Sequence, residues 1–192
     1  MYGVRPRNPP STTDAIHGVP TETCIAMSQY PIRKTIRLKN YDYRSKGVYH
    51  VTICAIYRDT IFGRVENGCM VLNDLGRVVE QKIGELPGHY AECDVIASVV
   101  MPNHVHLLVG LAMAADAIHG VPTAKHTLGQ IIGAYKASVS RAVGRTVWQP
   151  RYYEHIIRGD VDLQQTYEYI QNNPAAWDRD ELFIPTDPAH FP

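Results

Sequence analysis

The sequence predicts an α+β protein in which an antiparallel β-sheet is flanked by helices. Two observations support this fold class: short apolar runs rich in β-branched residues are joined by tight turns, and amphipathic helical patterns separate them. The predicted order is strand, hairpin, helix, two strands, helix, strand and helix. Because strands joined by short turns pair antiparallel, this order suits a ferredoxin-like or split β-α-β arrangement.

The first predicted elements are a strand and a small hairpin. Residues 48–56 are apolar and β-branched, as is typical of a buried strand. Two short strands, 61–65 and 69–72, follow around Asn67-Gly68, a dipeptide that favours a tight hairpin turn.

A helix and two further strands are predicted next. Asp74 can cap a helix whose apolar residues recur at helical spacing, and Pro87-Gly88 marks its end. The apolar runs 94–100 and 104–109 are separated only by three turn residues, so we expect two antiparallel strands.

The second half of the chain predicts a helix, a strand and a last helix. Thr127 precedes an amphipathic pattern over 128–143, which Gly144 ends. Residues 151–158 are strand-like, and 162–173 form a helical pattern that Pro174 ends.

Length and composition indicate one soluble domain without a strong overall electrostatic field. The 192 residues carry 19 Lys+Arg and 19 Asp+Glu, so any polyanion must be held by local patches. The apolar runs are too short to cross a membrane and the first residues show no secretory signal, so we expect a cytoplasmic protein. Four cysteines without a C-x-x-C pair are expected to be buried free thiols: Cys24, Cys54, Cys69 and Cys93.

The chain is predicted to consist of a loose leader (1–31), a main domain (32–183) and a tail (184–192). Residues 14–21 and 116–123 are both DAIHGVPT. Two copies of eight residues are too few for a solenoid, and surface loops accept insertions. We therefore interpret the second copy as part of a loop insert near 112–126. The histidines of this repeat, His17 and His119, are discounted as ligands.

The sharpest local feature is the pair His104 and His106. Alternation along a strand turns both side chains to one face and Val105 to the other. Two neighbouring imidazoles fit poorly in an apolar core, and neutral imidazole is a good ligand for divalent metals. The pattern leaves two interpretations open, a metal site or a structural pair bonded to the backbone.

A third group can come from the last helix. Tyr169 and Asn173 lie four residues apart and so share one helical face, beside a stripe that can pack on the sheet: Leu163, Thr166, Tyr167 and Ile170. A phenol is a possible nucleophile toward phosphorus when a metal polarises the phosphate. The alternative is that Tyr169 is a packing residue.

Other tyrosines and histidines are weaker candidates. Tyr135 is a rival nucleophile, but it lies on the apolar stripe of its helix and is expected in the core. Glu154 and His155 are expected to be packed or solvated. No partner at a telling spacing is found for the remaining histidines: His50, His89, His126 and His190.

A basic stretch with interleaved tyrosines suits nucleic acid, because cations contact phosphates and aromatic rings stack on bases. It contains Arg33, Lys34, Arg37, Lys39, Arg44 and Lys46. Arginines later in the chain, among them Arg151 and Arg158, can extend the track. The residues after 160 are acidic and are not expected to grip phosphate. The stretch by itself is equally consistent with a solvated face.

Three segments together resemble the HUH single-tyrosine transposases: MPNHVHLLV at 101–109, VWQPRYYEHIIR at 147–158 and YIQNNPAAW at 169–177. Within this superfamily they are most similar to the REP-associated tyrosine transposases, and residues 32–56 also resemble that branch. The resemblance covers about 32–183.

The resemblance implies a ferredoxin-like or RRM-like HUH endonuclease fold. It further implies a divalent metal, Mg²⁺ or Mn²⁺, held by His104, His106 and Asn173, and a nucleophilic Tyr169. The implied activity is cleavage and strand transfer of single-stranded or hairpin DNA through a covalent 5′-phosphotyrosine. Two alternatives stay open, a hairpin-binding module without turnover and a phosphodiesterase that uses water. A monomer and a homodimer are both compatible with the sequence.

Overall fold

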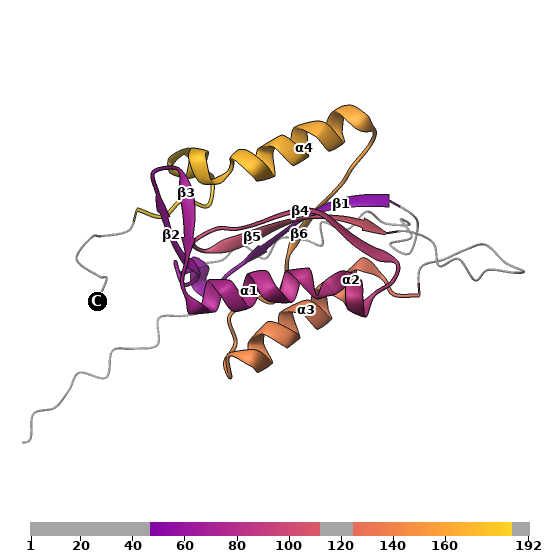
Figure 1. Ribbon diagram of the computed structural model, residues 1–192, viewed down its shortest axis with the longest axis horizontal. Coiled ribbons are helices and arrows are strands. Elements are labelled where there is room, and N and C mark those ends of the chain that lie inside the picture. The colour runs from indigo at the N-terminus through magenta and orange to yellow at the C-terminus, as the bar shows by residue number, and fades with distance from the viewer. Residues whose placement is uncertain (1–46, 112–124, 186–192) are drawn as a thin grey trace, which may run out of the picture. The chain divides into compact units, whose positions relative to one another are not determined.

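A computed structural model describes residues 47–111 and 125–185, which all belong to one compact unit, Thr35–Pro192 (Figure 1). The predicted leader, the basic stretch, the tail from residue 186 and almost all of the loop insert lie outside the described residues. The proposed division of the chain into these parts therefore stays a prediction.

Four antiparallel strands form the main sheet, in the order β4-β5-β1-β6. Their bounds are β1 Gly47–Cys54, β4 Cys93–Val100, β5 His104–Leu111 and β6 Tyr153–Ile156. Together with the helices on both faces, this sheet confirms the predicted α+β class. The predicted turn at 101–103 joins β4 to β5.

Helices cover both faces of the sheet, with α4 on one side and α1 and α3 on the other (Figure 1). The helices are α1 Asp74–Gly84, α2 Leu86–His89, α3 Leu128–Ala142 and α4 Asp160–Asn172, with the 3₁₀ helices η1 Ile56–Arg58 and η2 Pro174–Arg179. The larger core lies under α1 and α3, where β5 contributes Val105, Leu107 and Val109. A smaller apolar cluster of Ala97, Leu108 and Ile170 holds α4 to the other face.

A second, two-stranded sheet is the predicted hairpin, β2 Gly63–Glu66 and β3 Cys69–Leu72. Asn67 and Gly68 both have positive φ values, 52° and 75°, as a tight primed turn requires. A Cβ added at Gly68 would lie 3.5 Å from Cα of Ala175, so the hairpin tip contacts η2.

The start of α1 differs from the prediction, because Asn73 and not Asp74 is the N-cap. Oδ1 of Asn73 accepts a hydrogen bond from the Gly76 N–H at 2.9 Å, and its Nδ2 donates to the Ile61 carbonyl at 2.9 Å. One amide thus caps the helix and ties it to the preceding loop, which a carboxylate cannot do since it has no donor. Pro87 does not end the helical region but lies in the first turn of α2.

The helices α3 and α4 follow their predicted patterns with one exception. Thr127 and Gln130 form a reciprocal capping box at the start of α3, and Gly144 follows its end with φ 69°. On α4, Thr166 and Ile170 are buried, but the prediction that Tyr167 packs on the sheet is wrong: its side chain is 41% exposed.

Several boundaries and one burial prediction also need correction. β6 is shorter than the predicted 151–158, and β1 ends at Cys54 because residues 56–58 turn into η1. Cys54 and Cys93 are buried free thiols as predicted, whereas Cys69 is exposed on the hairpin. Among the described residues, no helix combines the length and the apolar character that crossing a membrane demands.

Candidate active site on the α4 face of the sheet

His104 and His106 lie side by side at the start of β5. Both are almost fully buried, and their Nε2 atoms are 3.0 Å apart. The strand alternation that turns Val105 into the core turns both imidazoles toward α4, as the sequence predicts. Two ring nitrogens therefore converge on one point.

The outer nitrogen of each ring also has a partner. Nδ1 of His104 lies 2.8 Å from Oδ1 of Asn103. Nδ1 of His106 lies 2.9 Å from Oγ1 of Thr52 and 3.1 Å from Nε2 of His50. These contacts orient both rings with Nε2 toward their shared point.

His50 is a member of the cluster that the sequence analysis missed. It has no partner near it in the sequence, but the antiparallel register sets Thr52 opposite His106 and so brings His50 diagonally next to that ring. The signal available was alternation: His50 and Thr52 must share one face of β1. The expectation that His50 lacks a telling partner is therefore wrong.

Tyr169 reaches the histidines from α4. Its phenol oxygen lies 3.4 Å from Nε2 of His106, and the two ring centroids are 5.2 Å apart. The side chain is 47% exposed, so a large substrate can approach the hydroxyl from solvent. The structure thus brings the predicted phenol to the predicted histidine pair.

Asn173 follows α4 as its C-cap, one turn beyond Tyr169, and is 2% exposed. Its Nδ2 donates to Oδ2 of Asp180 at 2.9 Å. Its Oδ1 is buried and has no hydrogen-bond partner among the described residues. Buried polar atoms are nearly always paired, so this oxygen is suited to a ligand.

Asp180 is the second residue that the sequence analysis missed. It follows η2, and the Leu182 N–H donates to its Oδ1 at 2.7 Å. One of its carboxylate oxygens and one nitrogen from each of His104 and His106 all lie within 4.8 Å of one another. No sequence signal singles it out in a stretch with several acidic residues.

This donor set fits a divalent metal. The two imidazole nitrogens, the Asp180 carboxylate and the unpaired Asn173 oxygen are ligand types that bind such ions. The exposed Tyr169 side leaves room for further ligands from a substrate. The site could therefore hold a divalent metal ion.

Burial keeps the histidines neutral. It lowers the pKa of His50 to about 4 and that of His104 and His106 well below the usual range. The neighbouring imidazoles lower the pKa of His106 further. For His104, the Asp180 carboxylate opposes the effect of burial by raising the pKa, and the Arg58 guanidinium lowers it. Neutral rings keep the lone pairs that metal binding needs.

The phenol of Tyr169 is harder to ionise than an ordinary tyrosine. Burial raises its pKa to about 12, and the charge of Asp180 and its hydrogen bond with the phenol act in the same direction. That hydroxyl donates to Oδ2 of Asp180 at 3.3 Å. The carboxylate is thus placed to accept the phenolic proton.

A groove of about 430 Å³ lies beside the phenol, between α4 and η2. Its walls include Gln165, Glu168, Arg179 and Glu181 together with Tyr169 itself. Three of its lining residues are acidic, Glu168, Asp180 and Glu181, and one is basic, Arg179.

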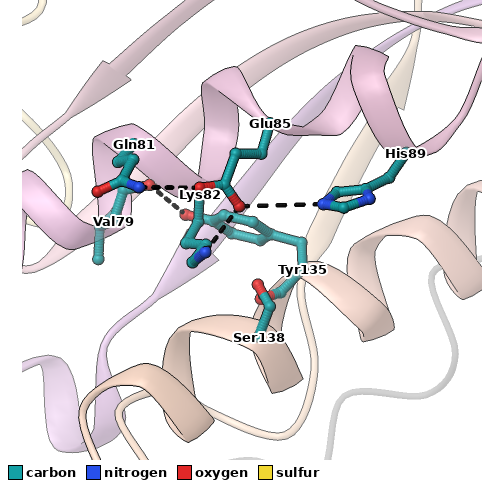
Figure 2. A network of polar contacts seen from close by, with 7 residues as sticks. All are labelled: Val79, Gln81, Lys82, Glu85, His89, Tyr135 and Ser138. Atoms are coloured by element: carbon teal, nitrogen blue, oxygen red, sulfur yellow. Dashed lines mark hydrogen bonds and ion pairs between the residues drawn. The ribbon is translucent and has the colours of Figure 1, made fainter.

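Tyr135 lies elsewhere, as predicted. It is 1% exposed between α1 and α3, its hydroxyl donates to the Val79 carbonyl at 3.5 Å, and burial raises its pKa (Figure 2). The polar network of Lys82, Glu85 and His89 beside it also lies on the α1 side of the sheet.

Only two of the predicted DNA-binding residues belong to the part of the chain that the structure describes, Arg151 and Arg158. The six basic residues from 33 to 46 lie outside the described residues. Arg151 precedes the edge strand β6 in the chain and Arg158 follows it, and both are exposed. His155 pairs with Asp162 at 3.0 Å at the start of α4 and lies opposite His50 in the register of β1 and β6.

Known proteins similar to this chain agree with the fold and the family. A Haemophilus influenzae protein of uncharacterized function is 36% identical over 168 residues, which cover 79% of this chain and 93% of that protein. A second protein of the same organism, which bears the name of a REP-associated tyrosine transposase, is 25% identical over 145 residues, 72% of this chain and 77% of that protein.

A solved structure of a REP-associated tyrosine transposase bound to a REP hairpin shares the fold. Its TM-score is 0.53 at 20% identity, and the match covers 81% of this chain and 95% of that chain. Residues 43–173 match the model of the family described as IS200-like transposases, a span that includes the histidine pair, Tyr169 and Asn173. Since this match spans most of the chain, the protein belongs to the IS200-like transposase family.

Proposed function

We propose that the protein is a metal-dependent endonuclease and strand transferase that acts on single-stranded, hairpin-forming DNA through Tyr169. The observation that carries this proposal is the approach of the Tyr169 hydroxyl to Nε2 of His106, 3.4 Å, beside a cluster of metal-ligand groups. A nucleophile at that distance from a cation site is suited to attack a phosphodiester held there.

The ligands of the cation would be Nε2 of His104 and of His106, with oxygen from Asn173 or Asp180. Mg²⁺ or Mn²⁺ suits the oxygen ligands and the phosphate substrate. When bound, the ion supplies charge neutralisation of the scissile phosphate and its alignment for in-line displacement.

The chain's own groups carry the proton and the new bond. The Tyr169 oxygen attacks phosphorus as its proton passes to Oδ2 of Asp180, 3.3 Å away. The bond between phosphorus and O3′ breaks, and O3′ leaves as a hydroxyl with a proton from a water molecule; the resulting hydroxide is neutralised by the proton that Asp180 accepted. The product is a 5′-phosphotyrosine, and attack by another 3′-hydroxyl reverses the step and joins two strands.

Hairpin DNA is the proposed substrate class. The solved structure that shares this fold is bound to a REP hairpin, and one relative bears the name of a REP-associated transposase. Contacts with DNA phosphates are assigned here to Arg151, Arg158 and the basic stretch, which contains Arg33, Lys34, Arg37, Lys39, Arg44 and Lys46.

A monomer is sufficient for this site. Tyr169 approaches the histidines of its own chain, so no second subunit is needed to supply the phenol. Association into a homodimer is compatible with the same geometry.

One observation favours a second candidate, a hairpin-binding module without turnover. The Tyr169 hydroxyl is bound to Asp180, whose charge helps to raise its pKa to about 12. In this candidate the carboxylate keeps the phenol protonated and the protein only binds DNA.

The test is an incubation of the full chain with 3′-labelled hairpin DNA and Mn²⁺ or Mg²⁺, followed by denaturing electrophoresis. A labelled covalent adduct that disappears in Tyr169→Phe supports the proposal. Tyr167→Phe on the same helix and Tyr135→Phe in the core should keep the adduct. Binding without an adduct supports the second candidate, and cleavage that survives Tyr169→Phe assigns the attack to water.

A further inference from the structure

Asn103 links two parts of the proposed site, the His104 ring and the segment that carries Asp180. It directly precedes His104, is 1% exposed, and contacts that histidine on one side and the C-terminal segment on the other. Its backbone carbonyl also accepts a hydrogen bond from the Ala55 N–H at 2.8 Å. Asn103 is thus hydrogen-bonded both to Ala55, which follows β1, and to Leu182.

The orientation of its side-chain amide follows from the contact with Leu182. The Leu182 carbonyl can only accept, so the group 2.8 Å from it must be the NH₂ of Asn103. The amide oxygen then faces Nδ1 of His104 at 2.8 Å. An amide oxygen cannot donate, so Nδ1 must carry the proton and Nε2 keeps its lone pair.

The groups at Nδ1 of His106 do not dictate its tautomer in this way, and its Nε2 faces the Tyr169 oxygen at 3.4 Å besides Nε2 of His104. Its Nδ1 faces the hydroxyl of Thr52 and a nitrogen of His50, and both groups can donate or accept. The first histidine is therefore set by its surroundings, while the second can adjust to it across the 3.0 Å contact between their Nε2 atoms.

The same amide also holds the segment that carries Asp180. Nδ2 of Asn103 binds the Leu182 carbonyl, and the Leu182 N–H binds Oδ1 of Asp180 at 2.7 Å. The Asn103 side chain thus connects the tautomer of His104 with the position of the Asp180 carboxylate, 77 residues after Asn103.

We propose that Asn103 is a positioning residue that presents the Nε2 lone pair of His104 to the cation and anchors the Asp180 segment against β5. The cation belongs to the proposed function, on which this inference rests. The tautomer and the anchoring, in contrast, are properties of the metal-free protein and can be measured without DNA.

The first measurement is the ring ¹⁵N spectrum of the histidines in the metal-free full chain, assigned with His104→Ala. The expected signature for His104 is a protonated Nδ1 and an unprotonated Nε2. Asn103→Asp should keep this tautomer, because a carboxylate still accepts from Nδ1. Asn103→Leu should lose it. A wild-type His104 protonated at Nε2 overturns the proposal.

The second measurement is amide hydrogen exchange at Leu182 and Phe183. Both variants lack the donor to the Leu182 carbonyl, so both should exchange faster there than the wild type. Gln81→Leu removes a carboxamide from α1 on the opposite face of the sheet and should change neither the tautomer nor the exchange. Unchanged exchange in both Asn103 variants overturns the anchoring role.

The third measurement is the affinity for Mn²⁺ by titration calorimetry. Loss of a group that orients a metal ligand typically weakens metal binding 10–100-fold, and we expect a loss of roughly that size for Asn103→Leu. Equal affinity in Asn103→Leu and wild type overturns the proposal. Failure of the wild type to form a DNA adduct, with these three results as expected, would count only against the proposed function.

Discussion

The phenol oxygen of Tyr169 lies 3.4 Å from Nε2 of His106, although 63 positions separate the two residues in the chain. Packing of α4 creates this approach: Ile170, next to the tyrosine, is fully buried against Ala97 and Leu108 of the sheet. The apolar cluster thus fixes the position and rotation of α4, the helix that carries Tyr169, relative to the sheet.

Removing that anchor should destabilise the protein. Ile170→Ala leaves a cavity between α4 and the sheet, and such substitutions in a packed core cost about 2–5 kcal/mol. Urea unfolding measures this loss. Val161→Ala, at an α4 position that is 72% exposed, is the control and should change the free energy of unfolding little. Equal losses in the two variants would show that Ile170 does not hold the helix.

Removing a histidine should separate cleavage from binding. His106→Ala removes one proposed metal ligand, so formation of the DNA adduct should be abolished, while hairpin binding, which depends mainly on phosphate contacts, should remain. Adduct formation and a gel-shift titration measure the two properties. His89→Ala, exposed on α2, should leave both unchanged. An adduct in His106→Ala would argue against the proposed metal site.

Neutralising Asp180 should make Tyr169 easier to ionise. The carboxylate raises the pKa of the phenol through its charge and its hydrogen bond, so Asp180→Asn should lower that pKa. An NMR titration of the metal-free protein with ring-labelled tyrosine measures this pKa, whereas adduct formation should fall, because Asp180 accepts the phenolic proton in the proposed step. Asp178→Asn, at an exposed neighbouring position, should change neither property. An unchanged or higher pKa of Tyr169 in Asp180→Asn would contradict this assignment.

The buried histidines should make the fold sensitive to mild acid. Below pH 6.5 the unfolded chain protonates His50, whereas the folded chain resists protonation down to about pH 4. The unfolded state then binds more protons, so the free energy of unfolding should fall as the pH drops from 6.5 toward 4, by up to about 1.4 kcal/mol per pH unit for each such histidine. Urea unfolding at several pH values measures the slope, and His50→Gln should make it shallower. An unchanged slope would remove His50 from this linkage.

The N-cap of α1 can be tested by removing the side chains of Asn73 and Asp74 in turn. Asn73→Ala should cost about 1 kcal/mol of stability, because the Gly76 N–H and the Ile61 carbonyl both lose their partner. Asp74→Ala, at the position expected from the sequence, removes an exposed carboxylate and its ion pair with Arg77 and should cost less, because exposed ion pairs contribute little to stability. Thermal unfolding of the two variants decides between the positions, and a larger loss for Asp74→Ala would restore the original assignment.

Local patterns predicted much of the fold. Alternation and turn residues placed the hairpin at Asn67-Gly68 and turned His104 and His106 to one face, because strand geometry dictates both from neighbouring residues. Boundaries are less predictable: Asn73 and Asp74 are both favoured N-cap residues, and the bond that distinguishes Asn73 reaches the Ile61 carbonyl, 12 positions away.

Local patterns are sufficient to predict four features: the α+β order of elements, the shared face of the two motif histidines, the shared helical face of Tyr169 and Asn173, and the resemblance to the transposase family. Each of these depends on spacing within one element or on a short motif. That His50 and Asp180 join these residues is visible only in the folded chain. Strand register brings the first and the turn after η2 brings the second. Contacts between distant parts of a chain depend on how elements pack, which the pattern of any single element does not contain.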